Sequence, residues 1–118
     1  MKDTLVISEL ATRVLAPGFE WMPYRDGVRI HRLYGAGEAG PSAALLRYEP
    51  GASIPRHVHQ GYEHLYVLHG TQVDARGTHA AGTLVINPPG SSHAVVSPTG
   101  CVVLVIWERP IAFDDRAG

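Results

Sequence analysis

Residues 51–70 read GASIPRHVHQGYEHLYVLHG, a segment with two histidines at strand spacing and a carboxylate four residues beyond them. Successive side chains of a β-strand point to opposite faces, so His57 and His59 share one face of the predicted strand. Residues 60–62 form a predicted turn, which brings Glu63 back beside the pair at the start of the next strand. Imidazole is the commonest side-chain metal ligand, so the segment predicts half of a metal coordination sphere.

Residues 82–93 read GTLVINPPGSSH and end in a further histidine. Two prolines restrict the approach and Gly90 permits a sharp turn just before His93. The residues between Glu63 and His93 include strand-like runs and a turn, long enough to return His93 to the same cavity. Three neutral nitrogens and one carboxylate suit Fe, Mn, Co, Ni, Cu or Zn, and ligand type alone does not separate these metals. No thiolate lies near, which excludes a cysteine-rich structural zinc site.

The spacing of these two segments resembles both sequence motifs of the cupin superfamily. The matching positions are Gly51, His57, His59, Glu63, Gly70, Gly82, Pro88, Gly90 and His93. Ser97 is a departure, because many cupins have Asn there. The resemblance implies an all-β fold, the cupin double-stranded β-helix or jelly-roll β-barrel. It also implies that His57, His59, Glu63 and His93 bind one divalent transition metal per chain, with Zn, Fe, Mn and Ni as candidates. A polar histidine cluster without a metal is the alternative.

Several short runs resemble one branch of cupins in particular, the cupin domain of anti-sigma factors of the ChrR type. These runs are residues 44–47, 50–52, 81–83, 87–93 and 100–101. The resemblance implies zinc bound by the same four ligands. That family joins the barrel to an N-terminal helical domain that holds the sigma factor. The present chain starts almost directly with the barrel, so what carries over is the barrel and the ion. Standalone relatives include acetylacetone-cleaving dioxygenases, whose three-histidine site differs from this set at Glu63.

The composition bounds the class of protein. A length of 118 residues, 45% hydrophobic and 18% charged, predicts one soluble domain over 1–118. The resemblance to cupins implies a single cupin domain with the barrel at about 20–110 and an N-terminal extension at 1–19. A net charge of −1 with scattered basic residues predicts no nucleic-acid or membrane partner. Cys101 is the single cysteine, so no internal disulfide forms, and its apolar surroundings predict a buried position. Without a membrane-spanning run or a signal-peptide core, we expect a cytoplasmic protein.

The predicted secondary structure is β throughout, because glycines and prolines punctuate short apolar runs. The predicted strands are Thr4–Ile7, Val28–Tyr34, Ala43–Tyr48, Ile54–His59, Glu63–His69, Thr71–Asp74, Thr83–Ile86, His93–Ser97 and Cys101–Trp107. One helix is predicted over Ser8–Leu15. In residues 65–68 and 101–107 both faces of the strand are apolar, so both faces should be covered. A second chain is the natural cover for the outer face, although the N-terminal segment is an alternative, and we expect a homodimer.

The surroundings of the metal follow from strand parity. Leu65 and Val67 share the face of Glu63, and Val95 shares that of His93, which predicts a mostly apolar cavity around a charged centre. Such a cavity favours a small, largely apolar ligand or substrate with one chelating head.

Polar residues near these strands are candidates for ligand or support roles. Arg47, Tyr66 and Trp107 are the candidate substrate-binding residues, and the alternative for each is a packing or surface role. A metal-ligating histidine donates its second ring N–H to an acceptor, and Glu49 is a candidate for that acceptor, with a solvated surface position as the alternative. The remaining histidines are predicted to lie outside the site, and they are His31, His64, His69 and His79.

Two functions fit these residues. The first is an enzyme, a metal-dependent dioxygenase or a related lyase or isomerase, in which the ion is a Lewis acid and Glu63 is a candidate base. The second is a non-catalytic zinc-binding sensor or ligand-binding module of the ChrR type. The same fold hosts many chemistries, so the identity of the metal is the observation that separates the two.

Overall fold

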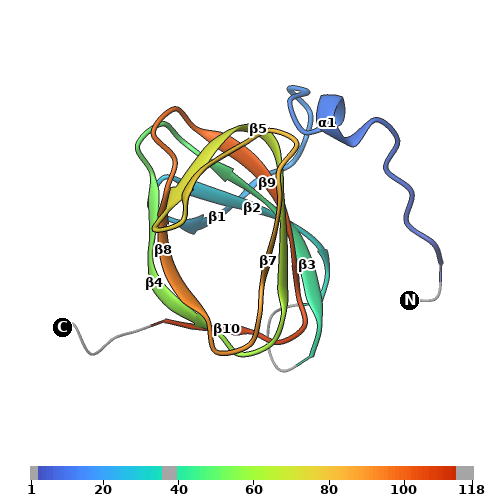
Figure 1. The fold of residues 1–118 in the computed structure, drawn as a ribbon. Coiled ribbons are helices and arrows are strands. Elements are labelled where there is room, and N and C mark those ends of the chain that lie inside the picture. The colour runs from blue at the N-terminus through green and yellow to red at the C-terminus, as the bar shows by residue number, and fades with distance from the viewer. Residues whose placement is uncertain (1–2, 36–39, 114–118) are drawn as a thin grey trace.

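The computed structural model describes residues 3–35 and 40–113, so residues 1–2, 36–39 and 114–118 of the predicted domain lie outside the described residues. The described chain forms an antiparallel β-barrel with a short helix outside it (Figure 1). In chain order the elements are α1 (Leu10–Arg13), β1 (Met22–Arg25), β2 (Val28–Tyr34), β3 (Ser42–Tyr48), β4 (Ser53–His59), β5 (Glu63–Asp74), β6 (Gly77–Ala80), β7 (Leu84–Asn87), β8 (Ser92–Val96), β9 (Cys101–Trp107) and β10 (Ile111–Phe113). The predicted all-β barrel is confirmed.

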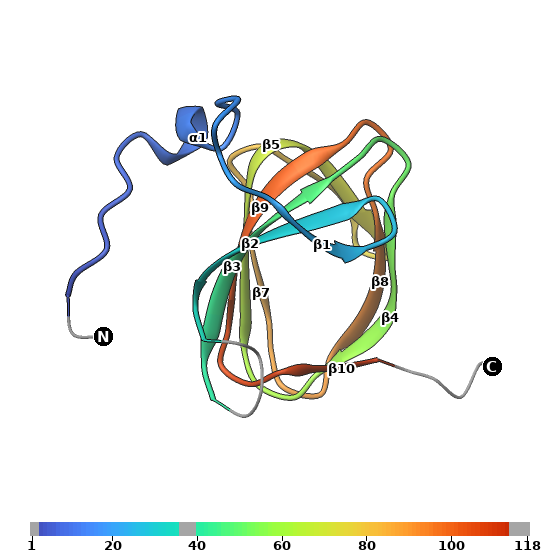
Figure 2. The same ribbon diagram turned by 180° about the vertical axis from the view of Figure 1, so that it is seen from behind.

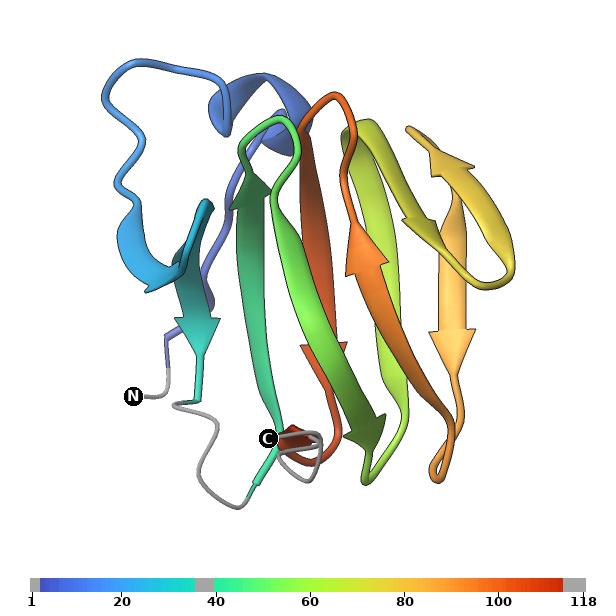
Figure 3. The ribbon, with the colours of Figure 1, turned by 90° about the vertical axis from the view of Figure 1, so that its left-hand side faces the viewer.

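Strand β5 joins the two halves of the barrel. Its first half pairs with β9 and β7 in a sheet that continues through β3 and β2 to β1. Its second half pairs with β6 and contacts β8 in the sheet that continues through β4 to β10. The crossing occurs at Gly70, which has a φ of 74°. A Cβ atom there would lie 2.0 Å from the carbonyl oxygen of Gly100, so only glycine fits this approach. Figure 3 shows the strands side by side along the barrel.

Most of the predicted strands are confirmed. Strands β2 and β9 have the predicted ends, and β3, β4, β7 and β8 differ by a single residue at one or both ends. The two runs predicted at 63–69 and 71–74 form one continuous strand of 12 residues, β5. The strand predicted at Thr4–Ile7 is wrong, because Leu5 and Val6 are 64% and 74% exposed and pair with no strand. The helix is shorter than predicted.

Strands β1, β6 and β10 were not predicted, and each pairs with a single neighbour. Pro23 lies inside β1, and proline is tolerated at a sheet edge, where one row of N–H groups has no partner. Strand β6 has a polar sequence and β10 has only three residues. Local sequence signals are weak in such edge strands.

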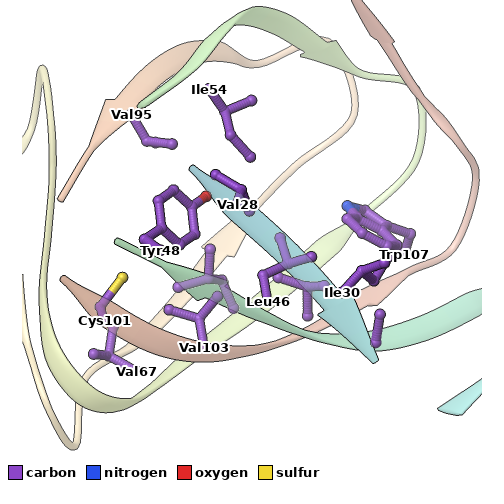
Figure 4. Packing of buried hydrophobic residues seen from close by; sticks show 13 residues of the cluster. Val28, Ile30, Leu46, Tyr48, Ile54, Val67, Val95, Cys101, Val103 and Trp107 are labelled. Atoms are coloured by element: carbon purple, nitrogen blue, oxygen red, sulfur yellow. The ribbon is translucent and has the colours of Figure 1, made fainter. Parts of the chain in front are cut away.

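The barrel interior is filled by one apolar cluster. Figure 4 shows Trp107 at one end of this cluster and Cys101 and Val67 at the other. Leu65, Val67 and Val95 belong to it, as strand parity predicts. The buried Cys101 thiol has a pKa raised by burial. Its position matches the prediction of a small buried hydrophobic side chain.

A second apolar cluster lies on the outer face of β3 and β9. Val14 from the N-terminal segment packs there with Leu45 and Val102, and all three are at most 3% exposed. Figures 1 and 2 show α1 outside the barrel wall. The N-terminal segment therefore covers part of the outer face within one chain. The described residues contain no helix with the length and hydrophobicity that a membrane crossing requires.

Candidate metal centre

Three histidines from two neighbouring strands meet inside the barrel. His57 and His59 come from β4 and His93 comes from β8, where it pairs directly with His57. The candidate ligand nitrogens of the three rings all lie within 4.8 Å of one another. The three residues are between 1% and 6% exposed, so they form a buried cluster. The structure thus brings together the three histidines that the spacing predicts.

Each imidazole has its Nδ1 atom engaged by an oxygen acceptor. Nδ1 of His57 donates to the Pro55 carbonyl at 2.9 Å, and Nδ1 of His93 donates to Asp74 Oδ2 at 3.0 Å. Nδ1 of His59 has two acceptors on Ser91, the Oγ atom at 2.9 Å and the carbonyl at 3.1 Å. Carbonyl and carboxylate oxygens only accept, and Ser91 Oγ donates its own proton to the Pro88 carbonyl, so the ring proton resides on Nδ1. Each Nε2 then has a free lone pair.

The Nε2 atom of His59 has no partner for its lone pair among the described residues. This atom is fully buried and has no hydrogen-bond partner in the described part of the chain. Buried polar atoms are nearly always satisfied, so an unpaired nitrogen inside a histidine cluster calls for a ligand. Neutral imidazoles with Nδ1 tied and Nε2 free are the form in which histidine binds a metal. The donor set therefore fits a transition metal ion.

Glu63 begins β5 and lies beside the cluster. Its Oε1 atom is 3.4 Å from Nε2 of His59. Asn87 Nδ2 donates to Oε1 at 2.9 Å, and Trp107 Nε1 donates to Oε2 at 2.7 Å. Burial alone would raise the pKa of the Glu63 carboxyl, but its contacts with His59 and the hydrogen bond from Trp107 hold this pKa below its usual value. The carboxylate is therefore ionised and fixed in position.

Burial also favours the neutral form of His57. Its pKa is lowered because the buried ring loses solvation in its charged form. A neutral ring keeps the Nε2 lone pair that a metal requires.

Asp74 supports the cluster from the far end of β5, and sequence reasoning missed it. Its side chain is 1% exposed, and Oδ1 accepts a hydrogen bond from His79 Nε2 at 3.0 Å while Oδ2 accepts from His93. His79, which the sequence places outside the site, thus supports it indirectly. For Glu49 the sequence left two possibilities, an acceptor for a ligand histidine or a solvated surface position. The structure supports the surface position, because Glu49 is exposed and Asp74 holds His93. The only sequence signal for Asp74 is its place at a strand end, which also fits a turn residue.

Space inside the barrel is limited. The cavity that His57, Glu63 and His93 line has a volume of about 20 Å³, and its other walls are mostly apolar. A water molecule needs roughly 10–15 Å³ by this kind of measure, so the cavity holds little more than one water-sized species. A pocket of about 210 Å³ opens at the barrel mouth and shares Tyr24, Trp107 and Ile111 with this cavity.

The three candidate substrate-binding residues lie in different places. Trp107 lines both the cavity and the mouth pocket. Arg47 pairs with Val102 and is exposed, and Tyr66 pairs with Leu104 and is 38% exposed, so both lie on the outer face. Of these three residues, Trp107 is the one that lines the cavity beside the histidines.

Comparisons with known proteins agree with this architecture. The family model of the ChrR cupin-like domain matches residues 12–111. A chain in the crystal structure of Rhodobacter sphaeroides SigE in complex with the anti-sigma ChrR is 29% identical with a TM-score of 0.71, covering 84% of this chain and 56% of that one. A Ralstonia eutropha JMP134 protein of unknown function with a cupin-like fold is 22% identical with a TM-score of 0.70, covering 78% and 61%. No curated protein matches the chain.

An acetylacetone dioxygenase from Acinetobacter johnsonii is 18% identical with a TM-score of 0.78, covering 100% of this chain and 81% of that one. At this identity the likeness shows the fold alone. The present chain spans less than two thirds of the length of the SigE–ChrR complex chain and of the Ralstonia chain.

A jelly-roll β-barrel with a buried three-histidine cluster defines a cupin with a candidate metal site. Because the family model covers most of its length, the chain belongs to the ChrR cupin-like domain family.

Proposed function

We propose that this chain is a mononuclear metal-binding cupin in which His57, His59, His93 and Glu63 hold one divalent transition metal ion. The observation that carries the proposal is the state of the rings. All three Nδ1 atoms donate to fixed acceptors, while the buried Nε2 atom of His59 has no hydrogen-bond partner among the described residues. Glu63 is the fourth ligand, because its ionised carboxylate lies beside His59.

The bound ion would supply Lewis acidity and, if it is redox-active, a site for oxygen chemistry. The chain's own residues fix the geometry around it. Hydrogen bonds from Asn87 and Trp107 engage both oxygens of Glu63, which favours a fixed ligand over a mobile general base. The small interior cavity leaves little room for bulk water beside the cluster, so a larger organic molecule approaches from the barrel mouth.

On this basis we favour an enzyme, a metal-dependent oxygenase or a related lyase or isomerase that acts on a small organic substrate. The supporting feature is the mouth pocket, which adjoins the cavity of the three histidines. The full-length likeness to the Acinetobacter johnsonii acetylacetone dioxygenase concerns the fold and is compatible with this choice.

A non-catalytic zinc-binding sensor or ligand-binding module is the second candidate. The family match over residues 12–111 and the 29% identity to a chain of the SigE–ChrR complex favour it. In this case the ion would stabilise the barrel, and binding of a small molecule would be the signal.

Elemental analysis separates the candidates. Untagged protein is purified without chelator or added metal, and the metal content per chain is measured. About one equivalent of iron, manganese or nickel supports the enzyme, whereas about one equivalent of zinc supports the sensor module. Absence of any metal, also after incubation with each of these ions, would refute the metal centre.

The ligand assignment is tested with variants. His57→Ala and His93→Ala are expected to lose the ion, because each removes one of the converging Nε2 atoms. His64→Ala is the matched control, since His64 lies in β5 next to Glu63 but is exposed. Full metal content in both ligand variants would contradict the assignment.

The sequence also predicts a homodimer, a cytoplasmic location and one domain over residues 1–118, and these stay predictions. The absence of a nucleic-acid partner and of a membrane partner stays a prediction as well.

A further inference from the structure

The mouth pocket has features that the metal centre does not explain. Its volume is about 210 Å³, and the residues that line it include Tyr24, Arg32, Ser42, Trp107, Ile111 and Phe113. Through Tyr24, Trp107 and Ile111 it adjoins the cavity that reaches His57, Glu63 and His93. A molecule in this pocket therefore lies at the entrance to the proposed metal site.

Ser42 contributes a buried hydroxyl that has no partner. The residue is 1% exposed, and its Oγ atom makes no hydrogen bond within the described part of the chain. It begins β3 opposite Trp107, which in turn lies opposite Glu63 on β5, so the hydroxyl sits on the same row as the metal-side carboxylate. Buried hydroxyls are normally satisfied, and an unsatisfied one lowers stability. Because the unsatisfied Ser42 hydroxyl lies at the wall of the mouth pocket, it indicates that a polar group of a ligand binds beside it.

Arg32 contributes a cationic group. Arg32 lies on the same face of β2 as the buried residues Val28 and Ile30. It pairs with Ala44, which belongs to the inner apolar cluster. The face of β2 that carries Arg32 is therefore the inward-facing one, at the barrel mouth. No carboxylate of residues 3–35 or 40–113 forms an ion pair with it. The neighbouring Arg25 is engaged, because its Cζ atom lies 3.6 Å from the centre of the Phe113 ring. The Arg32 guanidinium is thus available to an anion.

The remaining walls are aromatic or aliphatic. Tyr24, Trp107, Ile111 and Phe113 provide them. A cavity of about 150 Å³ is known to accommodate benzene, so this pocket has room for a small ring or a branched chain with one polar group. Burial raises the pKa of Tyr24, so its hydroxyl stays protonated at neutral pH and is able to donate a hydrogen bond to a ligand.

We propose that the mouth pocket binds a small organic carboxylate. The carboxylate lies between the Arg32 guanidinium and the Ser42 hydroxyl, and the apolar body rests on the aromatic wall with its far end toward the histidine cluster. Guanidinium and carboxylate form strong charge-assisted hydrogen bonds, and the Ser42 hydroxyl then gains the acceptor that it lacks. The inference rests on the proposed function only in calling this molecule the substrate or sensed ligand, because binding of the carboxylate itself needs no ion.

Calorimetric titration tests the proposal with benzoate as the probe and benzamide as its uncharged analogue of the same shape. Both metal-free and zinc-incubated protein are titrated. We expect benzoate to bind at least about tenfold more tightly than benzamide, because only benzoate forms the charge-assisted pair with Arg32. Equal affinities, or no benzoate binding at millimolar concentrations, would overturn the proposal.

Two variants locate the site. Arg32→Gln is expected to weaken benzoate binding by about tenfold or more, whereas Arg29→Gln, an exposed arginine on the opposite face of β2, leaves it unchanged. Ser42→Ala is expected to weaken benzoate binding severalfold without lowering the melting temperature, because it removes an unsatisfied hydroxyl. A fall in melting temperature with unchanged benzoate affinity would instead assign Ser42 a purely structural role. If Arg32→Gln does not fold, Arg32→Lys keeps the charge, and the proposal requires it to retain the preference for benzoate over benzamide.

The two proposals fail in different ways. Protein that takes up no metal but binds benzoate in an Arg32-dependent manner refutes the metal centre and leaves the carboxylate site standing. Protein that takes up metal but does not distinguish benzoate from benzamide refutes the carboxylate site and leaves the metal centre standing.

Discussion

The carboxylate of Asp74 accepts a hydrogen bond from Nδ1 of His93, with Oδ2 and Nδ1 3.0 Å apart. Asp74 ends β5 and Glu63 begins it, so one strand carries both the proposed carboxylate ligand and the residue that orients the third histidine. The pKa of Asp74 is held below its usual value despite burial, because His93, His79 and the backbone N–H of Arg76 all donate to it. Asp74 therefore remains an anion that favours the Nδ1-protonated form of His93.

Asp74→Asn is expected to weaken metal binding by about 10–100-fold, the usual effect of changing an acceptor behind a metal-bound histidine. The variant keeps the size of the side chain but loses its charge. Competition with a fluorescent zinc chelator measures the affinity. Glu49→Gln, at an exposed carboxylate, is the matched control and is expected to bind like the wild type. Equal affinities of the wild type and Asp74→Asn would show that the contact does not matter for the ion.

The stability of the metal-free protein is expected to fall with pH in two steps. The pKa of His57 in the folded state is lowered from its ordinary value of 6.5, so the unfolded chain binds more protons as pH falls below 6.5 and the folded state loses stability. The pKa of Glu63 is lowered from 4.5, so its contribution is present above 4.5 and is lost as pH falls through its folded-state value.

Melting temperatures recorded between pH 8 and pH 3 check this dependence. His57→Asn is expected to remove the first step, and His64→Asn to keep it, because His64 is exposed. A flat profile of the wild type across the first step would contradict the burial argument for His57.

Trp107→Phe is expected to destabilise the metal-free protein by about 2–3 kcal/mol, because it leaves Oε2 of the buried Glu63 carboxylate without its donor. Urea denaturation measures the change. The control is Trp21→Phe, since Trp21 is half-buried at the outer cluster and makes no contact with the metal centre. Similar losses in both variants would indicate lost packing rather than the lost hydrogen bond.

A second copy of the chain is expected to cover the outer face of β5, β7 and β9. Large apolar side chains remain exposed there, namely Tyr66, Leu84, Ile86 and Ile106. Exposed patches of this kind mark interaction surfaces. Light scattering is expected to give twice the chain mass of 12.7 kDa for the wild type and for Val6→Asp, and the chain mass for Ile86→Asp. A wild type that stays at 12.7 kDa across the micromolar range would refute the homodimer.

Strong local signals explain which parts of the structure could be predicted. Apolar runs bounded by glycine and proline predicted both ends of β2 and β9 correctly. The two-residue spacing predicted that His57 and His59 share one face of their strand. The edge strands β1, β6 and β10 lack such runs, because an edge strand needs neither two apolar faces nor a complete row of hydrogen bonds.

Long-range register decides the rest. Asp74 meets His93 across 19 residues of sequence, and Ser42 aligns with Trp107 from a strand far away along the chain. Neither pairing follows from periodicity within one strand. His79 was predicted to lie outside the site for the same reason, since its contact with Asp74 depends on the pairing of β5 with β6.

Two of the three rings in the histidine cluster have main-chain acceptors, because the carbonyls of Pro55 and Ser91 lie 2.9 Å and 3.1 Å from Nδ1 of His57 and His59. A side-chain substitution cannot delete a carbonyl, so these two orientations are largely insulated from point mutation. Asp74 is the exception, since a single codon change abolishes its carboxylate. Substitution of Asp74 can therefore change the metal affinity or the reactivity of the site, by evolution or by design, while all four proposed ligands stay intact.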